Sequence, residues 1–223
     1  SSSDWIKKEI NELKNISSLE IKTRTSVAAY HGYNYLLARE NLTDHLEKKD
    51  KNNKVRQRLL KIRAKKVILA TGALERPLIF NNNDRPGIML STAVKKYADF
   101  FGVKCGEKNV FFTNNDSAYE SALCLYNKGI KVDAIIDIRN NSNSKIVKAV
   151  EQAGIKIYWS HTVVDTNGYR RLDNISIMRL SNDGMTVTGK RINISCDCLG
   201  VAGGWTPAVH LFTQSGGKLK FDE

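Results

Sequence analysis

The chain has 223 residues, and 41% of them are hydrophobic, which excludes wholesale disorder and allows one large domain or two small ones. Its formal net charge is +12, but the basic residues are spread out, without an aromatic-interleaved patch or a helix-turn-helix pattern. We therefore expect no nucleic-acid partner. No apolar stretch approaches the ~20 residues of a membrane-spanning helix, and the polar start is unlike a signal peptide. These features predict a cytoplasmic protein that does not cross a membrane.

The first part of the chain predicts one helix and several strands. Residues 4–14 carry their apolar side chains on one stripe, which indicates an amphipathic helix. Residues 19–29 and 35–39 have strand character, as do residues 58–70. The last of these ends in Val67-Ile68-Leu69-Ala70, a continuous apolar run that is typical of a parallel strand buried on both faces.

The middle of the chain predicts a parallel sheet with crossover helices. Prolines and a run of asparagines exclude a helix between residues 77 and 86, and residues 91–101 then form a helix capped by Ser91 or Thr92. Strands and helices alternate afterwards, which favours right-handed crossovers. The strands are expected at 109–112, 132–138 and 155–159, and the helices at 117–128 and 144–153.

The last part predicts an antiparallel meander and a final buried strand. Residues 161–197 have short alternating runs separated by turn signals. Residues 199–202 form a buried strand that runs into small residues, as residues 67–70 also do. This shared pattern suggests that both strands belong to one sheet, with the intervening region inserted between them.

The sequence NVFFTNNDSAY, residues 109–119, occupies the position of a nucleotide-binding β-α turn. The three slots that such a turn reserves for glycine or a small residue hold Thr113, Asn115 and Ala118, and Asp137 follows where an acid would bind a ribose. One interpretation is a working nucleotide site. We favour the other, a Rossmann-like scaffold that binds no nucleotide here, because side chains at these slots crowd a pyrophosphate.

Two further expectations follow for this turn. Asp116 should cap the helix through its own carboxylate and repel an anion. Asp137 should be left as a solvated acid at the end of its strand.

Other candidate reactive groups are isolated. The four histidines have no carboxylate or cysteine at a useful spacing, so no metal site and no catalytic residue is assigned. The four cysteines are expected to be reduced structural thiols, with Cys196 and Cys198 on the same face of a strand.

Four blocks of the sequence carry a resemblance to a known family. They are ATGALERPLIFNNNDRPGIML, AVKKYADFFGVKCG, TNNDSAYE and VAGGWTPAVHLFTQSGGKL. In content, order and spacing they resemble the alpha subunits of heterotetrameric sarcosine oxidase, within the flavoproteins that have two dinucleotide-binding domains. The resemblance runs from Trp5 to Glu223.

The resemblance implies a fold and a reaction. The fold is α/β, with a Rossmann-like parallel sheet and antiparallel meander, residues 103–195, inserted into a partial FAD/NAD-binding-type domain, residues 1–97 and 196–223. The family enzyme oxidatively demethylates sarcosine to glycine, with hydrogen peroxide and a one-carbon unit for tetrahydrofolate. The alpha subunit holds NAD, while FAD and FMN belong to the holoenzyme, which also contains beta, gamma and delta subunits.

The resemblance also implies a few NAD contacts in this chain. Val27 matches a position whose backbone meets the adenine, and Ala70, Thr71 and Gly72 line the same pocket. The sequence contains no Gly-x-Gly-x-x-Gly, so the phosphate-binding β-α unit is missing, and it ends before the folate domain. We therefore expect a fragment that is inactive alone.

Two alternatives stay open: a non-catalytic scaffold or subunit-interaction module, and a subunit of a related amine or opine dehydrogenase. The role of Asn83-Asp84-Arg85 is also open.

Overall fold

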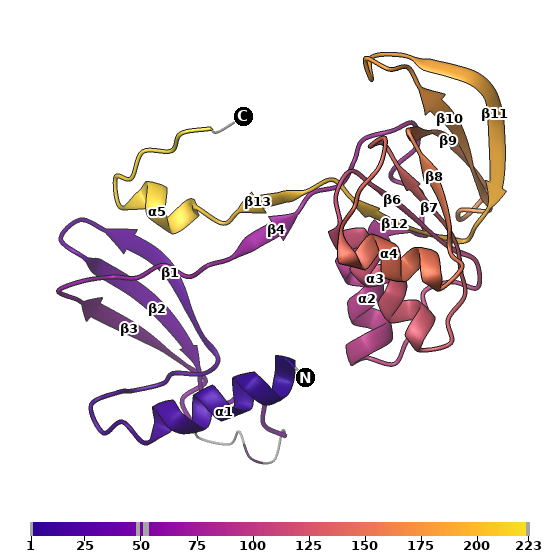
Figure 1. Ribbon diagram of the computed structural model, residues 1–223. Coiled ribbons are helices and arrows are strands. Elements are labelled where there is room, and N and C mark those ends of the chain that lie inside the picture. The colour runs from indigo at the N-terminus through magenta and orange to yellow at the C-terminus, as the bar shows by residue number, and fades with distance from the viewer. Residues whose placement is uncertain (1, 48–49, 51–53, 222–223) are drawn as a thin grey trace. The chain divides into compact units, whose positions relative to one another are not determined.

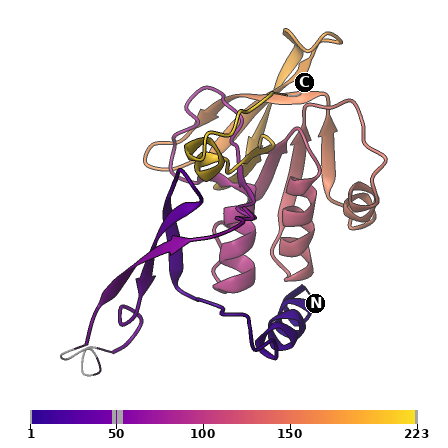
Figure 2. The same cartoon turned by 90° about the vertical axis from the view of Figure 1, so that its left-hand side faces the viewer.

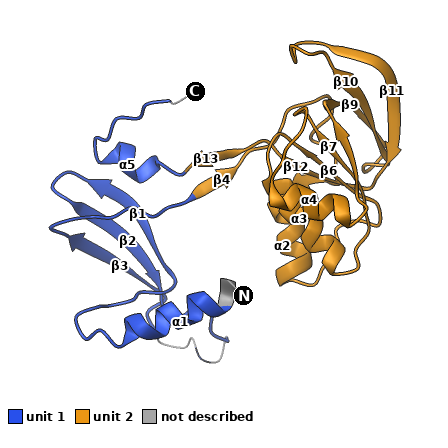
Figure 3. Ribbon diagram, in the orientation of Figure 1, with its two compact units in different colours: residues 1–72, 208–223 blue, residues 73–207 orange. Residues whose placement is uncertain are grey.

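The chain folds into two compact units (Figure 3). The computed structural model describes residues 2–47, 50 and 54–221. Unit 1 comprises residues 1–72 and 208–223, and unit 2 comprises residues 73–207. The boundaries expected near residues 97–103 and 195–196 are therefore corrected to 72–73 and 207–208, because the segments on either side of the expected insertion belong to the sheet of unit 2.

Unit 1 contains a small antiparallel sheet. Its strands are β1 (Thr25–His31), β2 (Tyr35–Asn41) and β3 (Gln57–Arg63), in the order β1-β2-β3. The unit also contains the amphipathic helix α1 (Ser2–Lys14) and the short helix α5 (His210–Gln214). The Gln214 side chain accepts the Tyr30 N–H at 3.0 Å, which ties α5 to the β1 strand.

The apolar run Val67–Ala70 does not form a strand. The Ile68 side chain is 92% exposed, although the sequence predicts burial on both faces. The expectation that this run shares a sheet with residues 199–202 is wrong, because those residues lie in the parallel sheet of unit 2. A parallel strand needs neighbours on its edges, and no strand of the described chain pairs with this run.

Unit 2 is built on a five-stranded parallel sheet, in the order β5-β12-β6-β7-β8. The strands are β5 (Ile88–Leu90), β6 (Asn109–Thr113), β7 (Val132–Asp137), β8 (Lys156–Trp159) and β12 (Cys198–Ala202). The helices α2 (Ser91–Phe100), α3 (Ser117–Asn127) and α4 (Lys145–Gln152) cover one face, with α2 and α3 side by side (Figures 1 and 2). The predicted α/β fold with a Rossmann-like parallel sheet is confirmed.

The other face of this sheet packs against the predicted meander, which is also confirmed. It consists of β9 (His161–Asn167), β10 (Asn174–Leu180) and β11 (Val187–Ser195), all antiparallel. Side chains alternate between two hydrophobic clusters, so that Phe111 faces the helices and Val110 faces the meander. Cys196 and Cys198 belong to opposite clusters, which corrects the prediction of a common face, because Cys196 precedes β12.

A two-stranded ribbon, β4 (Ala73–Glu75) with β13 (Trp205–Pro207), leads into and out of this sheet. Glu75 caps α2: its carboxylate accepts the Thr92 N–H at 3.0 Å and the Ser91 hydroxyl at 2.6 Å. The predicted caps, Ser91 and Thr92, are therefore donors to a remote carboxylate. Gly203 is needed beside the ribbon, since a Cβ there would lie 2.7 Å from the Pro77 carbonyl oxygen.

The asparagine-rich segment before β5, residues 81–85, is hydrogen-bonded to the meander. Arg85 donates to the Thr166 hydroxyl at 3.3 Å and to the Gly168 carbonyl oxygen. The Asn81 and Asn82 amides donate to Asp165 at 3.0 and 3.2 Å. These contacts join segments that are far apart in the sequence, and they give Arg85 a structural role that the sequence left open.

We predict that Arg85→Ala destabilises the chain by roughly 1–3 kcal/mol, because it leaves the Gly168 carbonyl oxygen and the Thr166 hydroxyl without their donor. The measurement is the free energy of unfolding in urea. Arg170→Ala is the matched control, since Arg170 is exposed and its guanidinium lies over the ring of the adjacent residue, Tyr169. Equal losses in the two variants would contradict the assigned role.

Candidate functional site

The side chains of the turn between β6 and α3 hydrogen-bond to the polar groups of that turn and of β12. The Asn115 side-chain oxygen accepts the Ser117 N–H at 3.0 Å and the Ser117 hydroxyl at 2.5 Å. Its amide nitrogen donates to the Ala202 carbonyl oxygen at 3.2 Å. The Thr113 hydroxyl accepts the Asn115 N–H at 3.0 Å. Asn115 therefore spans the space between the start of α3 and the end of β12.

This geometry identifies the residue that caps α3. Asp116 occupies the N-cap position but makes no side-chain cap hydrogen bond. The expectation that its carboxylate caps the helix is therefore wrong, and the Asn115 amide takes that role. The physical reason is that the Asp116 carboxylate points to a cation instead, with Oδ1 2.8 Å from Arg139 Nη2.

Arg139 lies between two carboxylates. Its Nη2 is 2.8 Å from Asp137 Oδ2, and its Nε donates to Asp137 Oδ1 at 3.1 Å. Asp137 is completely buried at the end of β7, where it also accepts the Arg139 N–H at 2.9 Å and the Tyr119 hydroxyl at 2.8 Å. The prediction of a solvated Asp137 is wrong, because these donors replace water around its carboxylate.

The surroundings shift the protonation of this group of residues. Hydrogen bonding to Asp137, opposed by burial and then reinforced by Asp116, raises the pKa of the Arg139 guanidinium. Burial works against ionisation of Asp116, but hydrogen bonds from Ser144 and Arg139 hold its pKa below the usual value. Burial and the neighbouring Asp137 carboxylate raise the pKa of the Tyr119 hydroxyl. These shifts keep Arg139 cationic, the Asp116 carboxyl ionised and the Tyr119 hydroxyl neutral at neutral pH.

The arrangement is unsuited to a dinucleotide. A pyrophosphate binds at a helix start through free N–H groups and a positive potential. Here the Ser117 N–H is already bonded to Asn115, and the half-buried Asp116 carboxylate beside the helix start is paired with Arg139. The acid at the position that would bind a ribose hydroxyl is Asp137, and its carboxylate is bonded to Arg139 and Tyr119 instead.

Two members of this network were not singled out in the sequence. Arg139 follows Asp137 by two positions, just beyond the end of β7. From there its Nε donates to both carboxylate oxygens of Asp137. Tyr119 comes from the first turn of α3, and its ring stacks on Trp159 with 6.2 Å between centroids. The only signal in the sequence was a basic residue close to the strand-end acid, which does not distinguish an ion pair from a ligand-binding cation.

The residues that the resemblance assigns to NAD lie in unit 1. Val27 lies on β1 beside a bulge, and its side chain is 40% exposed. Ala70, Thr71 and Gly72 are exposed in a segment without regular secondary structure, where Gly72 has a positive φ of 68°. The Thr71 hydroxyl donates to the Ala208 carbonyl oxygen at 2.6 Å, so this segment is held beside the chain that leads into α5.

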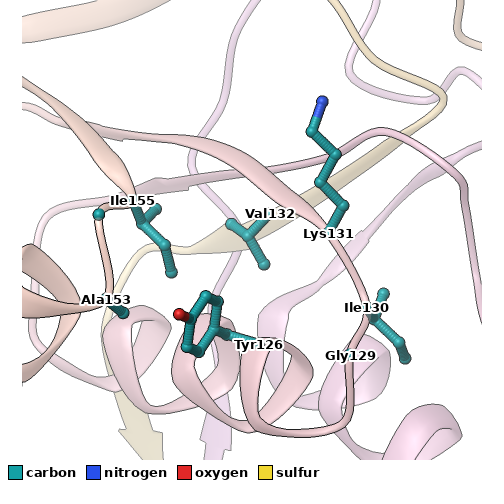
Figure 4. Close-up of a pocket in the computed structure, with 8 residues that line it drawn as sticks. Tyr126, Gly129, Ile130, Lys131, Val132, Ala153 and Ile155 are labelled. Carbon is teal, nitrogen blue, oxygen red and sulfur yellow. The ribbon is translucent and has the colours of Figure 1, made fainter.

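A pocket of about 270 Å³ lies at the amino ends of the strands of the unit 2 sheet (Figure 4). The Asn115 turn lies at their carboxyl ends. It is lined by the turns that end α3 and α4 and by the starts of β7 and β8, including Tyr126, Val132 and Ile155. Lys131 extends away from the Tyr126 ring (Figure 4). No carboxylate, histidine or cysteine lines the pocket, so it offers no acid–base or nucleophilic pair.

The described residues contain no group of three or more His, Cys, Asp and Glu side chains placed to hold a metal ion. Within the same residues, no helix has the length and apolar character of a membrane span.

The chain is similar over nearly its whole length to sarcosine oxidase alpha subunits. It is 39% identical over 220 residues to the sarcosine oxidase subunit alpha of Corynebacterium sp. (strain P-1) and 33% identical over 216 residues to that of Rhizobium meliloti (strain 1021). These matches cover 98% and 96% of this chain, but only 22% and 20% of the relatives. The chain thus spans about a fifth of their length.

Solved structures share the fold. Thioredoxin reductase of T. acidophilum matches with a TM-score of 0.67 at 18% identity, covering 98% of this chain and 64% of that one. L-Proline dehydrogenase of P. horikoshii matches with a TM-score of 0.57 at 21% identity, covering 96% and 34%. A family model described as pyridine nucleotide-disulphide oxidoreductase matches residues 24–223. The chain therefore belongs to the pyridine nucleotide-disulphide oxidoreductase family.

Proposed function

We propose that the chain is the central part of a sarcosine oxidase alpha subunit. The observation that carries this proposal is the 39% identity over 98% of the chain to a relative of that name. In this proposal the whole enzyme oxidatively demethylates sarcosine to glycine, yielding hydrogen peroxide and a one-carbon unit for tetrahydrofolate. Beta, gamma and delta subunits complete the assembly, and FAD and FMN lie outside this chain.

We place the NAD of the intact subunit in unit 1. The exposed residues Val27 and Ala70–Gly72 can give a flat base an apolar contact and accessible backbone. The Thr71 hydroxyl bonds to the Ala208 carbonyl oxygen at 2.6 Å, which holds this exposed segment beside the chain that leads into α5. Among the described residues of this segment, no glycine-rich turn is present to bind the phosphates, so the chain alone should hold NAD weakly.

Unit 2 has a different part in the proposal. Its sheet has the architecture of a second dinucleotide-binding domain, but Asn115 is bonded to the helix N–H that a pyrophosphate would use, and Asp137 is bonded to Arg139 instead of a ribose. Unit 2 therefore serves as a scaffold within the subunit. The same filled turn favours the second candidate function, a non-catalytic interaction module, which binding of purified beta subunit to this chain alone would support.

The filled turn predicts that NAD does not bind at residues 113–118, even at millimolar concentration. Asn115 occupies the helix N–H group and Asp116 repels the phosphates. The measurement is a titration with NAD followed through the backbone amide shifts of these residues. Amides near Val27 and Gly72 provide an internal comparison. Saturable shifts at residues 113–118 below millimolar NAD would show a working nucleotide site.

The chain alone is predicted not to oxidise sarcosine, because its described side chains form no catalytic acid–base pair and its sequence has no glycine-rich turn for the flavin phosphates. The measurement is a peroxide assay with sarcosine and added FAD. Hydrogen peroxide added to the same mixture checks that the assay responds. Turnover above the protein-free blank would mean that a complete active site lies within these residues.

A further inference from the structure

The edge strand β3 of unit 1 differs from comparable edge strands in its regularity. In the two three-stranded sheets, the outer strands are β1, β3, β9 and β11. The pairing of β1, β9 and β11 with their neighbours is interrupted by register shifts. The pairing of β3 with β2 is continuous over all seven residues. Bulges are a common means of protecting an edge from further pairing, and β3 lacks one.

The β3 strand is also open to solvent. Six of its seven residues are exposed, including the apolar side chain of Leu59, which is 61% exposed. By contrast, β1 is covered in part by α5, through the Gln214 side chain bonded to the Tyr30 N–H. An exposed, regular edge presents a row of unpaired backbone N–H and C=O groups, which is the surface that an added strand requires.

The charge of this edge indicates what can pair with it. Unit 1 has 18 basic against 10 acidic residues, a net +8 of the total +12. Arg58 is balanced by Glu40 at 3.6 Å. No ion pair within the described residues involves the cations at the end of the strand and just beyond it, which are Lys61, Arg63, Lys65 and Lys66.

We infer that β3 is a docking strand for an extended acidic segment of a protein partner. The segment would add as a fourth strand, with main-chain hydrogen bonds supplying affinity and its carboxylates meeting Lys61 and Arg63. Successive side chains of a strand point to opposite faces, so Lys61 and Arg63 share one face of β3 and the exposed Ile62 lies on the other. A segment of alternating acidic and apolar side chains therefore fits this edge. This inference stands apart from the proposed enzyme function, because it uses no residue assigned to NAD.

The test uses the whole chain and a short fluorescent peptide of alternating glutamate and valine. Binding is followed by anisotropy at low and moderate salt, and hydrogen exchange locates the bound strand. We expect saturable binding that weakens with salt, with slower exchange of β3 amides. Lys61→Glu with Arg63→Glu should weaken binding roughly tenfold. Lys190→Glu, on the bulged edge strand β11, is the matched control and should not weaken it.

Two further probes separate strand addition from simple charge attraction. A peptide with proline at alternate positions keeps its carboxylates but lacks main-chain donors, so it should not slow exchange in β3. Equal binding and equal protection by this peptide would overturn the inference, as would tighter binding of a single-stranded oligonucleotide. The exchange measurement uses the unmodified chain, so it decides the matter even if a charge-reversal variant fails to fold.

Discussion

Arg139 is held between the carboxylates of Asp137 and Asp116, and this interaction determines what the carboxyl edge of the unit 2 sheet can bind. Asp137 is completely buried, and an unpaired carboxylate there would carry a large desolvation penalty. Arg139 and the Tyr119 hydroxyl together satisfy it. The same guanidinium reaches Asp116 at the start of α3, so β7 and α3 are joined at the point where a nucleotide would lie between them.

Asn115 makes a hydrogen bond at the start of α3 that a bound phosphate would make. Its side-chain oxygen accepts the Ser117 N–H, as a phosphate oxygen does at the start of a helix. Its amide nitrogen bonds to Ala202 on the neighbouring strand. The polar groups that a bare glycine turn would offer to a cofactor are therefore satisfied internally. The sheet therefore has the Rossmann-like architecture, while side chains of the chain itself occupy the hydrogen-bonding groups at its turn.

Much of unit 2 could be predicted because its strands are short buried runs separated by amphipathic helices and glycine stops. The helix stops at Gly129 and Gly154, for example, follow directly from the pattern, and both have positive φ angles. Sheet membership could not be predicted in the same way. Residues 67–70 and 199–202 have the same apolar character, but only the second run has strands on both sides, at β5 and β6. A continuous apolar run indicates that a strand would be buried between partner strands. It does not indicate which strands those partners are.

The sequence predicted correctly that side chains occupy the turn at the candidate site. The contacts that it predicted for Asp116 and Asp137 were wrong. The missing glycines at residues 113 and 115 indicated a turn unsuited to pyrophosphate, and side chains do fill it. The sequence did not show which side chains satisfy one another, because capping depends on side-chain direction as well as on position. Asp116 had the usual cap position but turns toward Arg139, and Asn115 takes its place.

The ion pair between Asp116 and Arg139 is tested most directly by titration of the Asp116 carboxyl carbon by NMR, in the wild-type chain and in Arg139→Gln. Asp116 should titrate below the ordinary aspartate value, since its pKa is lowered by hydrogen bonds from Ser144 and Arg139 against the effect of burial. Loss of the guanidinium should move that pKa upward, and the stabilisation it provides should be lost as the pH falls through it. An ordinary pKa that is the same in both proteins would contradict the closed network.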